Sequence, residues 1–199
     1  MSDEAVAALR AGQLVVLPTD TVYGLCADAY RERPCLRLYA AKQRPETMPI
    51  QLLAADLDAI LDAVPEARGR GAVAARALLP GPYTLILPNP ARRFRWLTGT
   101  RPETIGVRVP DLPAEARDVV RRVGAVAATS ANRHGESDPR RLEDLPEEIR
   151  NAVVTVDGGK LPGVPSTVLD LASPEPLVLR EGAVPAAVAL ARVEAALAQ

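Results

Sequence analysis

Lys42-Gln43-Arg44-Pro45 is the stretch around which the rest of this chain is organised. Lysine supplies a compact charge on a flexible stem, and arginine supplies a planar fork that can grip a phosphate with two bonds. Pro45 ends the preceding helix and fixes the direction in which the chain leaves it. Two cations one residue apart suit a site that holds several negative oxygens. The alternative is solvated charge that complements the negative end of the helix dipole.

The composition indicates one globular domain spanning residues 1–199. Hydrophobic residues make up 48% of the chain and aromatic residues 3%, so the core must be built from Ala, Val, Leu and Ile. The net charge of −1 argues against a protein whose main role is to coat nucleic acid, for which a strong basic excess is expected. We find no internal repeat and no low-complexity linker that would divide the chain.

The cysteines and the N-terminus predict a soluble, cytoplasmic protein without membrane contact. Cys26, Cys35 and the lone His134 are too few for a metal cluster, and we expect both thiols to be buried hydrophobes in a reducing compartment. Asp3 and Glu4 stand where a signal peptide would need basic residues. No apolar run approaches the roughly 20 residues that a membrane span requires.

Helical and strand-like patterns alternate along the chain, which predicts an α/β fold. The apolar runs predict strands at 14–17, 50–53, 83–87, 104–110, 125–128, 153–156, 166–171 and 177–182. The amphipathic stretches predict helices from Ser2 to Gly12 and at 33–42, 56–63, 67–79, 113–123, 146–151 and 185–198. In the last helix we expect four buried contacts, at Val188, Ala191, Val193 and Leu197.

Small polar side chains follow several of these strands. Thr19-Asp20-Thr21 comes after the first strand, where it either contacts a ligand or caps its own turn. Thr129-Ser130-Ala131-Asn132 likewise suits either a ligand or a helix cap. Arg108 stands in an otherwise apolar run, so it needs a bound anion or an acidic partner unless it lies on a surface edge.

Other motifs point away from common nucleotide-binding loops. Gly158-Gly159-Lys160 lacks the earlier glycine and the following helix of a P-loop, and no Gly-x-Gly-x-x-Gly occurs. The basic and aromatic stretch 92–96 could touch RNA, but a solvated loop with one anchoring aromatic is the favoured interpretation. The remaining candidates are cations, hydroxyls and an amide, with no evident general base or nucleophile. Such a set suits phosphate chemistry, in which positioning and charge neutralisation supply most of the catalysis.

Seven blocks of this sequence, in order from about residue 10 to 185, resemble the YrdC-like family of threonylcarbamoyl-AMP synthases. The blocks are Pro18-Thr19-Asp20-Thr21-Val22-Tyr23-Gly24-Leu25, Lys42-Gln43-Arg44-Pro45 with Pro49, Leu79-Pro80-Gly81-Pro82-Tyr83-Thr84, Val107-Arg108-Val109-Pro110, Ser130-Ala131-Asn132, Ser166-Thr167-Val168 and Val178-Leu179-Arg180-Glu181-Gly182. The chain is similar to the short, single-domain form that lacks an appended C-terminal domain.

The resemblance implies a twisted mixed sheet with flanking helices and a basic concave face that binds ligands. It implies a nucleotidyltransferase that condenses L-threonine, bicarbonate and ATP, used with Mg²⁺, into threonylcarbamoyl-AMP and pyrophosphate. The product is the donor for modification of tRNA adenosine 37, with handover to a threonylcarbamoyl transferase complex as a further expectation.

Matched motif by motif, the resemblance also assigns roles to residues. Those for ATP are Lys42, Arg44, Thr84, Ser130, Asn132 and Arg180, with Lys42 and Arg44 also catalytic. Those for threonine are Thr21, Arg108 and Ser166, and no side chain is assigned to a metal. Met48 and His134 depart from the family pattern, so no contact is assigned to Met48, and His134 is interpreted as loop filler.

Two rival functions remain open from the sequence. One is an RNA-binding module of the same fold acting in ribosomal RNA maturation, or a weak RNA contact by the enzyme itself. Net charge and aromatic poverty count against it. The other is carbamoyl transfer in hydrogenase cofactor assembly, whose relatives are longer chains with zinc-finger-like cysteines.

Overall fold

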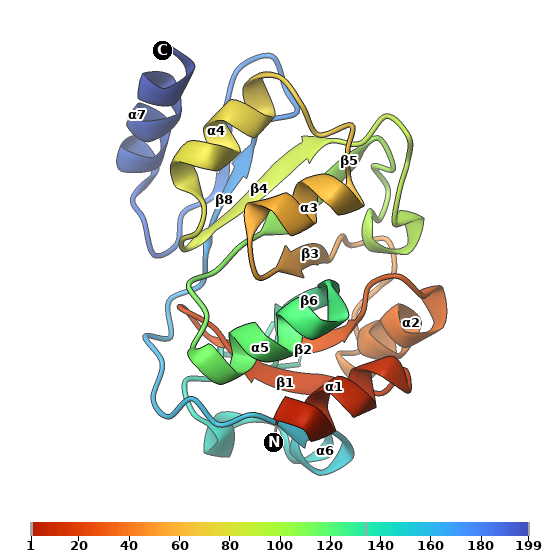
Figure 1. The fold of residues 1–199 in the computed structure, drawn as a ribbon. Coiled ribbons are helices and arrows are strands. Elements are labelled where there is room, and N and C mark those ends of the chain that lie inside the picture. The colour runs from red at the N-terminus through yellow and green to blue at the C-terminus, as the bar shows by residue number, and fades with distance from the viewer. Residues whose placement is uncertain (1, 134, 199) are drawn as a thin grey trace.

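The computed structural model describes residues 2–133 and 135–198, which fold around one mixed sheet (Figure 1). The nine strands are hydrogen-bonded in the order β7-β1-β2-β6-β3-β5-β4-β8-β9. Their bounds are β1 (Val15–Pro18), β2 (Tyr23–Asp28), β3 (Gln51–Ala54), β4 (Tyr83–Pro88), β5 (Thr104–Arg108), β6 (Ala125–Ser130), β7 (Val154–Thr155), β8 (Thr167–Asp170) and β9 (Leu177–Arg180).

The described residues also form seven α-helices and two 3₁₀ turns; the first α-helix precedes the first strand, the last α-helix follows the last strand, and the others lie between strands. The α-helices are α1 (Ser2–Arg10), α2 (Glu32–Ala41), α3 (Leu57–Ala63), α4 (Arg70–Leu78), α5 (Ala114–Val123), α6 (Glu147–Ala152) and α7 (Ala186–Leu197). The 3₁₀ turns are η1 (Arg95–Leu97) and η2 (Leu142–Asp144). The predicted α/β class and mixed sheet are confirmed, as is the position of every predicted helix to within two or three residues. His134, which the sequence suggested to be loop filler, lies outside the described residues.

The sequence prediction missed one strand, β2. It interpreted residues 19–21 as ligand contacts or a turn with no strand after them, whereas β2 begins at Tyr23, directly after a turn at residues 19–22. β2 is buried and pairs antiparallel with both β1 and β6. Gly24 and the polar turn before it interrupt the apolar pattern, so the strand carries a weak signal of its own. The hairpin is nevertheless central, because its turn delivers polar side chains to the candidate active site.

Alternation along the strands divides the core between two faces of the sheet. On one face, Leu52, Val107 and Leu85 belong to a large cluster that α2, α3, α4 and α7 cover. On the other face, α1 and α5 cover a smaller cluster built around Leu17 and Val126. These two helices pack on the half of the sheet that contains β1, β2 and β6. The cluster reaches Leu53 of β3 but includes no residue of β5, β4 or β8, where the same face of the sheet leaves room for a ligand.

The C-terminal helix corrects one expectation about packing. α7 buries Ala189, Val193 and Ala196, whereas Val188 and Ala191, which were predicted to be buried, are exposed. The buried positions follow a helical i, i+4, i+7 spacing and α7 lies against α4. The prediction was therefore correct for Val193 but wrong about which side of the helix faces the core. Alanine on both sides of the helix gives the sequence little contrast from which to choose a face.

The cysteine prediction is confirmed, since Cys26 and Cys35 are both free and buried. Burial raises the pKa of each thiol to about 12, so neither behaves as a reactive thiolate near neutral pH. Across the part of the chain that the structure describes, no helix combines the length and the apolar character needed to span a bilayer.

Candidate active site

A pocket of about 360 Å³ lies on the uncovered half of the sheet. Its floor consists of alternate residues of neighbouring strands, as the two-residue period of a strand requires. Six of the nine residues predicted to bind ligands line this pocket: Arg44, Thr84, Arg108, Ser130, Ser166 and Arg180. The remaining three, Thr21, Lys42 and Asn132, contact residues of that lining through hydrogen bonds. All nine are thus brought to one place from seven separate segments.

Lys42 lies behind the pocket wall rather than on its surface. It is 1% exposed, and its Nζ donates to the carbonyl of Ser130 at 2.5 Å and to the carbonyl and side-chain oxygens of Asn132 at 2.7 and 2.8 Å. The interpretation of this lysine as solvated charge is therefore wrong. These hydrogen bonds hold the chain in place at the end of β6. Ser130 Oγ adds to them by donating to Asn132 Oδ1 at 2.7 Å.

The end of helix α2 turns the chain so that Lys42 and Arg44 point to the same region. Gln43 adopts a left-handed conformation with φ of 51°, and the N–H of Arg44 returns to the carbonyl of Tyr39 at 3.0 Å. This pattern closes a helix in the way that a C-terminal glycine usually does. A non-glycine residue in that conformation carries some strain, which is common beside functional sites.

Burial and a neighbouring cation both act on the charge of Lys42. Burial lowers the pKa of Lys42 to about 8, and Arg44 contributes in the same direction, whereas Asp138 and Glu136 oppose the shift. Asp138 also accepts a hydrogen bond from Asn132 Nδ2 at 3.3 Å. It is the only carboxylate among the described residues that line the pocket.

Arg44 and Arg180 bring two further cations to the pocket. Arg44 Nη2 donates to the carbonyl of Pro49 at 2.9 Å, while its Nε is buried with no hydrogen-bond partner among the described residues. Burial lowers the pKa of Arg44, and the charge of Arg180 lowers it further. Mutual repulsion of this kind favours an anion between the two guanidinium groups.

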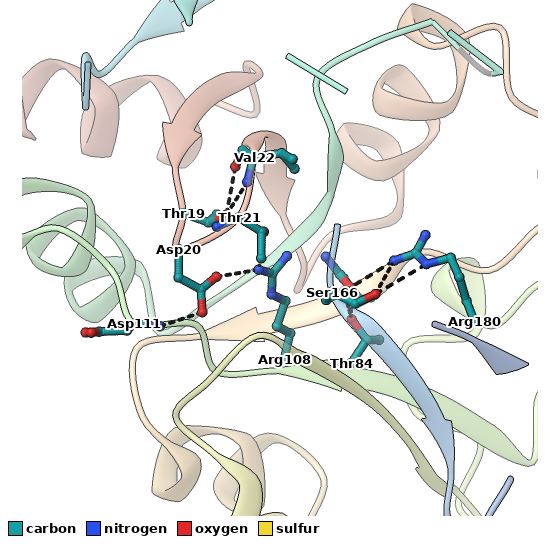
Figure 2. A network of polar contacts seen from close by, with 10 residues as sticks. Thr19, Asp20, Thr21, Val22, Thr84, Arg108, Asp111, Ser166 and Arg180 are labelled. Carbon is teal, nitrogen blue, oxygen red and sulfur yellow. Dashed lines mark hydrogen bonds and ion pairs between the residues drawn. The ribbon is translucent and has the colours of Figure 1, made fainter. Parts of the chain in front are cut away.

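A chain of hydroxyl groups joins the neighbouring strands on the pocket floor (Figure 2). Thr84 Oγ1 donates to Gln51 Oε1 at 2.7 Å and lies 2.8 Å from Ser166 Oγ. Arg180 Nη2 donates to the carbonyl of Ser166 at 2.8 Å. These groups are polar, fixed by the sheet and pointed at the same space, so they can hydrogen-bond the oxygens of a bound ligand.

Arg108 is buried and ion-paired, which decides among the three environments that its position in the sequence allowed. It is 3% exposed, so the surface-edge interpretation is wrong. Its Nη2 donates to Asp20 Oδ1 at 2.5 Å and to Thr21 Oγ1 at 2.6 Å (Figure 2). The acidic partner that the sequence required is therefore Asp20, which sits in the β1–β2 turn. Arg108 Nε remains without a hydrogen-bond partner among the described residues.

Two polar segments that could either cap the backbone or serve a ligand are also resolved by the structure. The segment after Ser130 does not begin a helix within the described residues up to η2, so the helix-cap interpretation of residues 129–132 is wrong. In the β1–β2 turn, Thr19 does cap backbone groups of Thr21 and Val22. The capping interpretation of residues 19–21 is therefore confirmed. Thr21 also hydrogen-bonds the pocket residue Arg108, and its contact with a ligand stays a prediction.

The basic and aromatic stretch 92–96 is tied down by its tryptophan. Trp96 anchors this loop by donating from Nε1 to the carbonyl of Ala29 at 3.0 Å. Phe94 packs beside it, with the two ring centroids 6.3 Å apart. The interpretation of this stretch as a loop with an anchoring aromatic is therefore the one that the structure supports.

Several pocket residues escaped the sequence analysis. They are Gln51 at the start of β3, Asp138, and four residues of one segment before and within β5: Thr98, Thr100, Arg101 and Thr104. The Thr-Gly-Thr-Arg run at 98–101 was the available signal. Isolated threonines in a loop are so common that this run did not stand out from an ordinary turn.

The described side chains do not by themselves form a metal cage. No group of three or more His, Cys, Asp or Glu residues suited to a metal ion occurs among the described residues. Four arginines line the pocket, at positions 44, 101, 108 and 180, which favours anionic ligands. The arrangement can hold negative oxygens at several points.

Comparison with known proteins gives consistent matches over most of the chain. The family model Sua5/YciO/YrdC, described as telomere recombination, matches residues 7–182. The threonylcarbamoyl-AMP synthase of Bacillus subtilis is 34% identical over 184 residues, which is 91% of this chain and 53% of that protein. The threonylcarbamoyl-AMP synthase of Stenotrophomonas maltophilia is 35% identical over 180 residues, which is 88% of this chain and 91% of that protein.

A solved structure supports the same relationship. The crystal structure of Pyrococcus abyssi Sua5 complexed with L-threonine superposes with a TM-score of 0.85 at 32% identity, covering 94% of this chain and 56% of that one. The chain thus spans about half the length of its relatives from Bacillus subtilis and Pyrococcus abyssi.

Proposed function

This chain belongs to the Sua5/YciO/YrdC family, and on that premise we propose that it is a threonylcarbamoyl-AMP synthase. It would condense L-threonine, bicarbonate and ATP into threonylcarbamoyl-AMP and pyrophosphate. The observation that carries the proposal is the pocket itself, in which cations and hydroxyls from seven segments converge and Asp138 is the one carboxylate among the described lining residues. Such a site suits a reaction whose nucleophile belongs to the substrate.

The chemistry requires anions to be held against one another. The threonine amine attacks the carbon of bicarbonate, whose C–OH bond breaks so that water leaves with an amine proton and a carbamate remains. An oxygen of this carbamate attacks the α-phosphorus of ATP, and the bond from that phosphorus to the departing pyrophosphate breaks. Arg44 and Arg180 offset repulsion between the carbamate and the phosphates, and Arg108 with Thr21 and Ser166 holds the amino acid. Thr84, Ser130 and Asn132 donate or accept hydrogen bonds at the nucleotide.

Lys42 contributes its charge from behind the wall formed by Ser130 and Asn132. Its three hydrogen bonds fix the backbone carbonyls of Ser130 and Asn132 and the side-chain oxygen of Asn132, so this side of the nucleotide site keeps its geometry. Removal of either Lys42 or Arg44 should cost about 2–4 kcal/mol of transition-state stabilisation, by analogy with the loss of one preorganised donor.

We propose that Mg²⁺ enters the pocket on ATP. The donor set fits this arrangement because the described residues offer one pocket carboxylate, Asp138, and no preformed cage. Magnesium is commonly held by substrate phosphates with one or two carboxylates. When bound, it would neutralise charge on the leaving pyrophosphate.

The downstream role follows from the product. Threonylcarbamoyl-AMP is a reactive mixed anhydride, so we propose handover to a transferase complex that modifies adenosine 37 of tRNA. Such a role places the protein in the cytoplasm, where ATP and tRNA are available. Free, buried cysteines are consistent with a reducing compartment.

The experiment that tests the proposal is pyrophosphate release by the purified protein. Release should require ATP, threonine and bicarbonate together, and omission of any one should abolish it. Release from ATP alone would contradict the proposed reaction. A salt-sensitive RNA complex that ignores ATP and threonine, with no pyrophosphate released, would instead favour the RNA-binding module.

A further inference from the structure

Asp20 is a carboxylate that reaches the pocket only through another side chain. Its Oδ1 accepts a hydrogen bond from Arg108 Nη2 at 2.5 Å, and its Oδ2 accepts one from the backbone N–H of Asp111 at 3.2 Å (Figure 2). Arg108 lines the pocket, whereas Asp20 stands behind it. Both carboxylate oxygens are therefore committed, one of them to a pocket residue.

The turn that carries Asp20 is held rigidly. Thr19 Oγ1 accepts from the backbone N–H groups of Thr21 and Val22, each at 3.2 Å, and donates to the carbonyl of Val22 at 2.7 Å. Threonine hydroxyls that bond their own turn in this way restrict its backbone. The position of the Asp20 carboxylate is consequently fixed by the β1–β2 turn on one side and by Asp111 on the other.

These contacts fix the orientation of the Arg108 guanidinium group. Nη2 carries two N–H bonds, and it donates to Asp20 Oδ1 and, at 2.6 Å, to Thr21 Oγ1. Because the guanidinium group is planar, anchoring Nη2 also sets the direction of Nε. Nε is buried and has no hydrogen-bond partner among the described residues.

Charge supports the same assignment. Burial lowers the pKa of Arg108 and the nearby charge of Arg180 adds to this effect, whereas Asp20 opposes both. A second cation close by would push an untethered guanidinium group away from the pocket. Asp20 supplies the attraction that holds it there.

We propose that Asp20 is a positioning residue for amino-acid binding. It anchors Arg108 so that the free side of the guanidinium group faces a small planar anion, which we take to be the carboxylate of the amino-acid substrate. The choice of amino acid rests on the proposed function. Asp20 does not touch the substrate, and its whole effect passes through Arg108.

Asp20→Asn tests the proposal by removing the charge while keeping the shape of the side chain. The threonine KM and the Kd for threonine measured by calorimetry should rise about tenfold, since a charge-assisted hydrogen bond that orients the site is weakened. The KM for ATP should stay within about twofold, because the ATP contacts arise on other segments. A purely structural defect would raise both KM values or lower only the folded fraction. An unchanged threonine KM and Kd in folded Asp20→Asn would overturn the proposal.

Asp111→Asn is the matched control. It removes an exposed carboxylate that pairs with Arg117. The backbone N–H of residue 111, which donates a hydrogen bond to Asp20, stays in place. Threonine binding should be unaffected in this variant. If Asp111→Asn also lost threonine affinity about tenfold, general surface charge would be responsible, and the proposal would be overturned.

A second background keeps the test decisive if Asp20→Asn does not fold, since that change leaves a buried arginine without its partner. In Arg108→Gln, where the charge is already gone, adding Asp20→Asn should change threonine binding by less than about twofold. A further tenfold loss in the double variant would mean that Asp20 acts independently of Arg108, contrary to the proposal.

The binding measurement separates this inference from the proposed function. Calorimetry with threonine needs no turnover, so the Kd values of wild type and Asp20→Asn can be compared even if the protein forms no adenylate. A tenfold higher Kd in Asp20→Asn, with no adenylate formed by the wild type, would reject the synthase and retain the role of Asp20. Normal adenylate synthesis with an unchanged threonine KM in Asp20→Asn would do the reverse, and wild-type protein that binds no threonine would reject the inference outright.

Discussion

Lys42 is a cation buried away from water, so its charged form pays a desolvation penalty in the folded protein. The fold surrounds Nζ with three oxygen acceptors, but burial and Arg44 still lower the pKa of Lys42 from 10.5 to about 8. Between those two values the unfolded chain holds more protons than the folded chain at this residue. The free energy of unfolding should therefore rise with pH across that window.

The first prediction concerns this pH dependence. From pH 8 to pH 10.5, the contribution of Lys42 to the free energy of unfolding should increase by up to about 3 kcal/mol. Urea unfolding of wild type and Lys42→Met over this range measures it, because the difference between the two curves removes the other titrating groups. Lys160→Met is the control, since Lys160 is the other lysine and is exposed. A wild-type curve parallel to that of Lys42→Met would contradict the prediction.

Arg44 differs from Lys42 in that it faces the pocket directly. Its buried Nε has no partner among the described residues, so a ligand oxygen is its natural acceptor. We predict that Arg44→Ala lowers the rate of pyrophosphate release by about 10²- to 10³-fold, as expected for one lost donor at developing charge.

The matched control for Arg44→Ala is Arg95→Ala, which removes an exposed arginine from η1 outside the pocket. Steady-state assays should find wild-type activity in Arg95→Ala. Equal losses in the two variants would argue that the protein responds only to its total positive charge.

At the scale of elements, two loops that flank the pocket depend on each other. Gly99 has φ of +57°, and a Cβ there would lie 2.4 Å from the carbonyl oxygen of Thr47. The loop after α2 and the loop before β5 therefore fit together only because residue 99 has no side chain. Thr98 and Thr100, on either side of it, line the pocket.

We predict that Gly99→Ala destabilises the protein by about 2–4 kcal/mol and raises the KM for at least one substrate, since backbone strain and a backbone clash combine. Gly69→Ala is the control, because Gly69 has φ of +68° with open space around it. Its cost should be about 1–3 kcal/mol from backbone strain alone, because φ of 68° with ψ of −146° is a conformation that glycine almost alone adopts. Chemical denaturation of both variants compares them, and equal losses would contradict the predicted contact between the loops.

Helix α7 offers a test of packing that the sequence alone could not settle. Val193 is buried and Val188 is 43% exposed on the same helix. We expect Val193→Ala to lower the free energy of unfolding by about 2 kcal/mol and Val188→Ala to lower it by less than about 0.5 kcal/mol. A larger loss at Val188, measured by thermal or urea unfolding, would mean that the helix packs by its opposite side.

Helices and strands with a strong apolar period were predictable, and so were polar groups that directly follow a strand. β2 was missed because a glycine and a tight polar turn hid its period, and the face of α7 was missed because alanines blur it. For Arg108, the sequence could show only that a buried arginine needs an anion or an acidic partner, and it could not identify Asp20 as that partner. Residues 20 and 108 meet through the sheet order, in which β2, β6 and β3 lie between their strands. Local sequence carries no record of that order.

At the scale of the molecule, the site exists because the helices cover the sheet unevenly. α1 and α5 shield one half of a face, and the other half is left as a pocket of about 360 Å³ lined by four arginines. That volume is within the range of small-molecule sites. Segments from residue 21 to residue 180 contribute to it, so the fold must be complete before the site exists.

The central claim is that one pocket joins carbon from bicarbonate to threonine and transfers the resulting carbamate to the α-phosphate of ATP. Mass spectrometry of the mixed anhydride, formed with ¹³C-labelled bicarbonate, tests this most directly. We expect an adenylate that carries both the threonine and the labelled carbon, with pyrophosphate as the second product. An unlabelled aminoacyl adenylate, or no adenylate at all from folded protein with all three substrates, would contradict it.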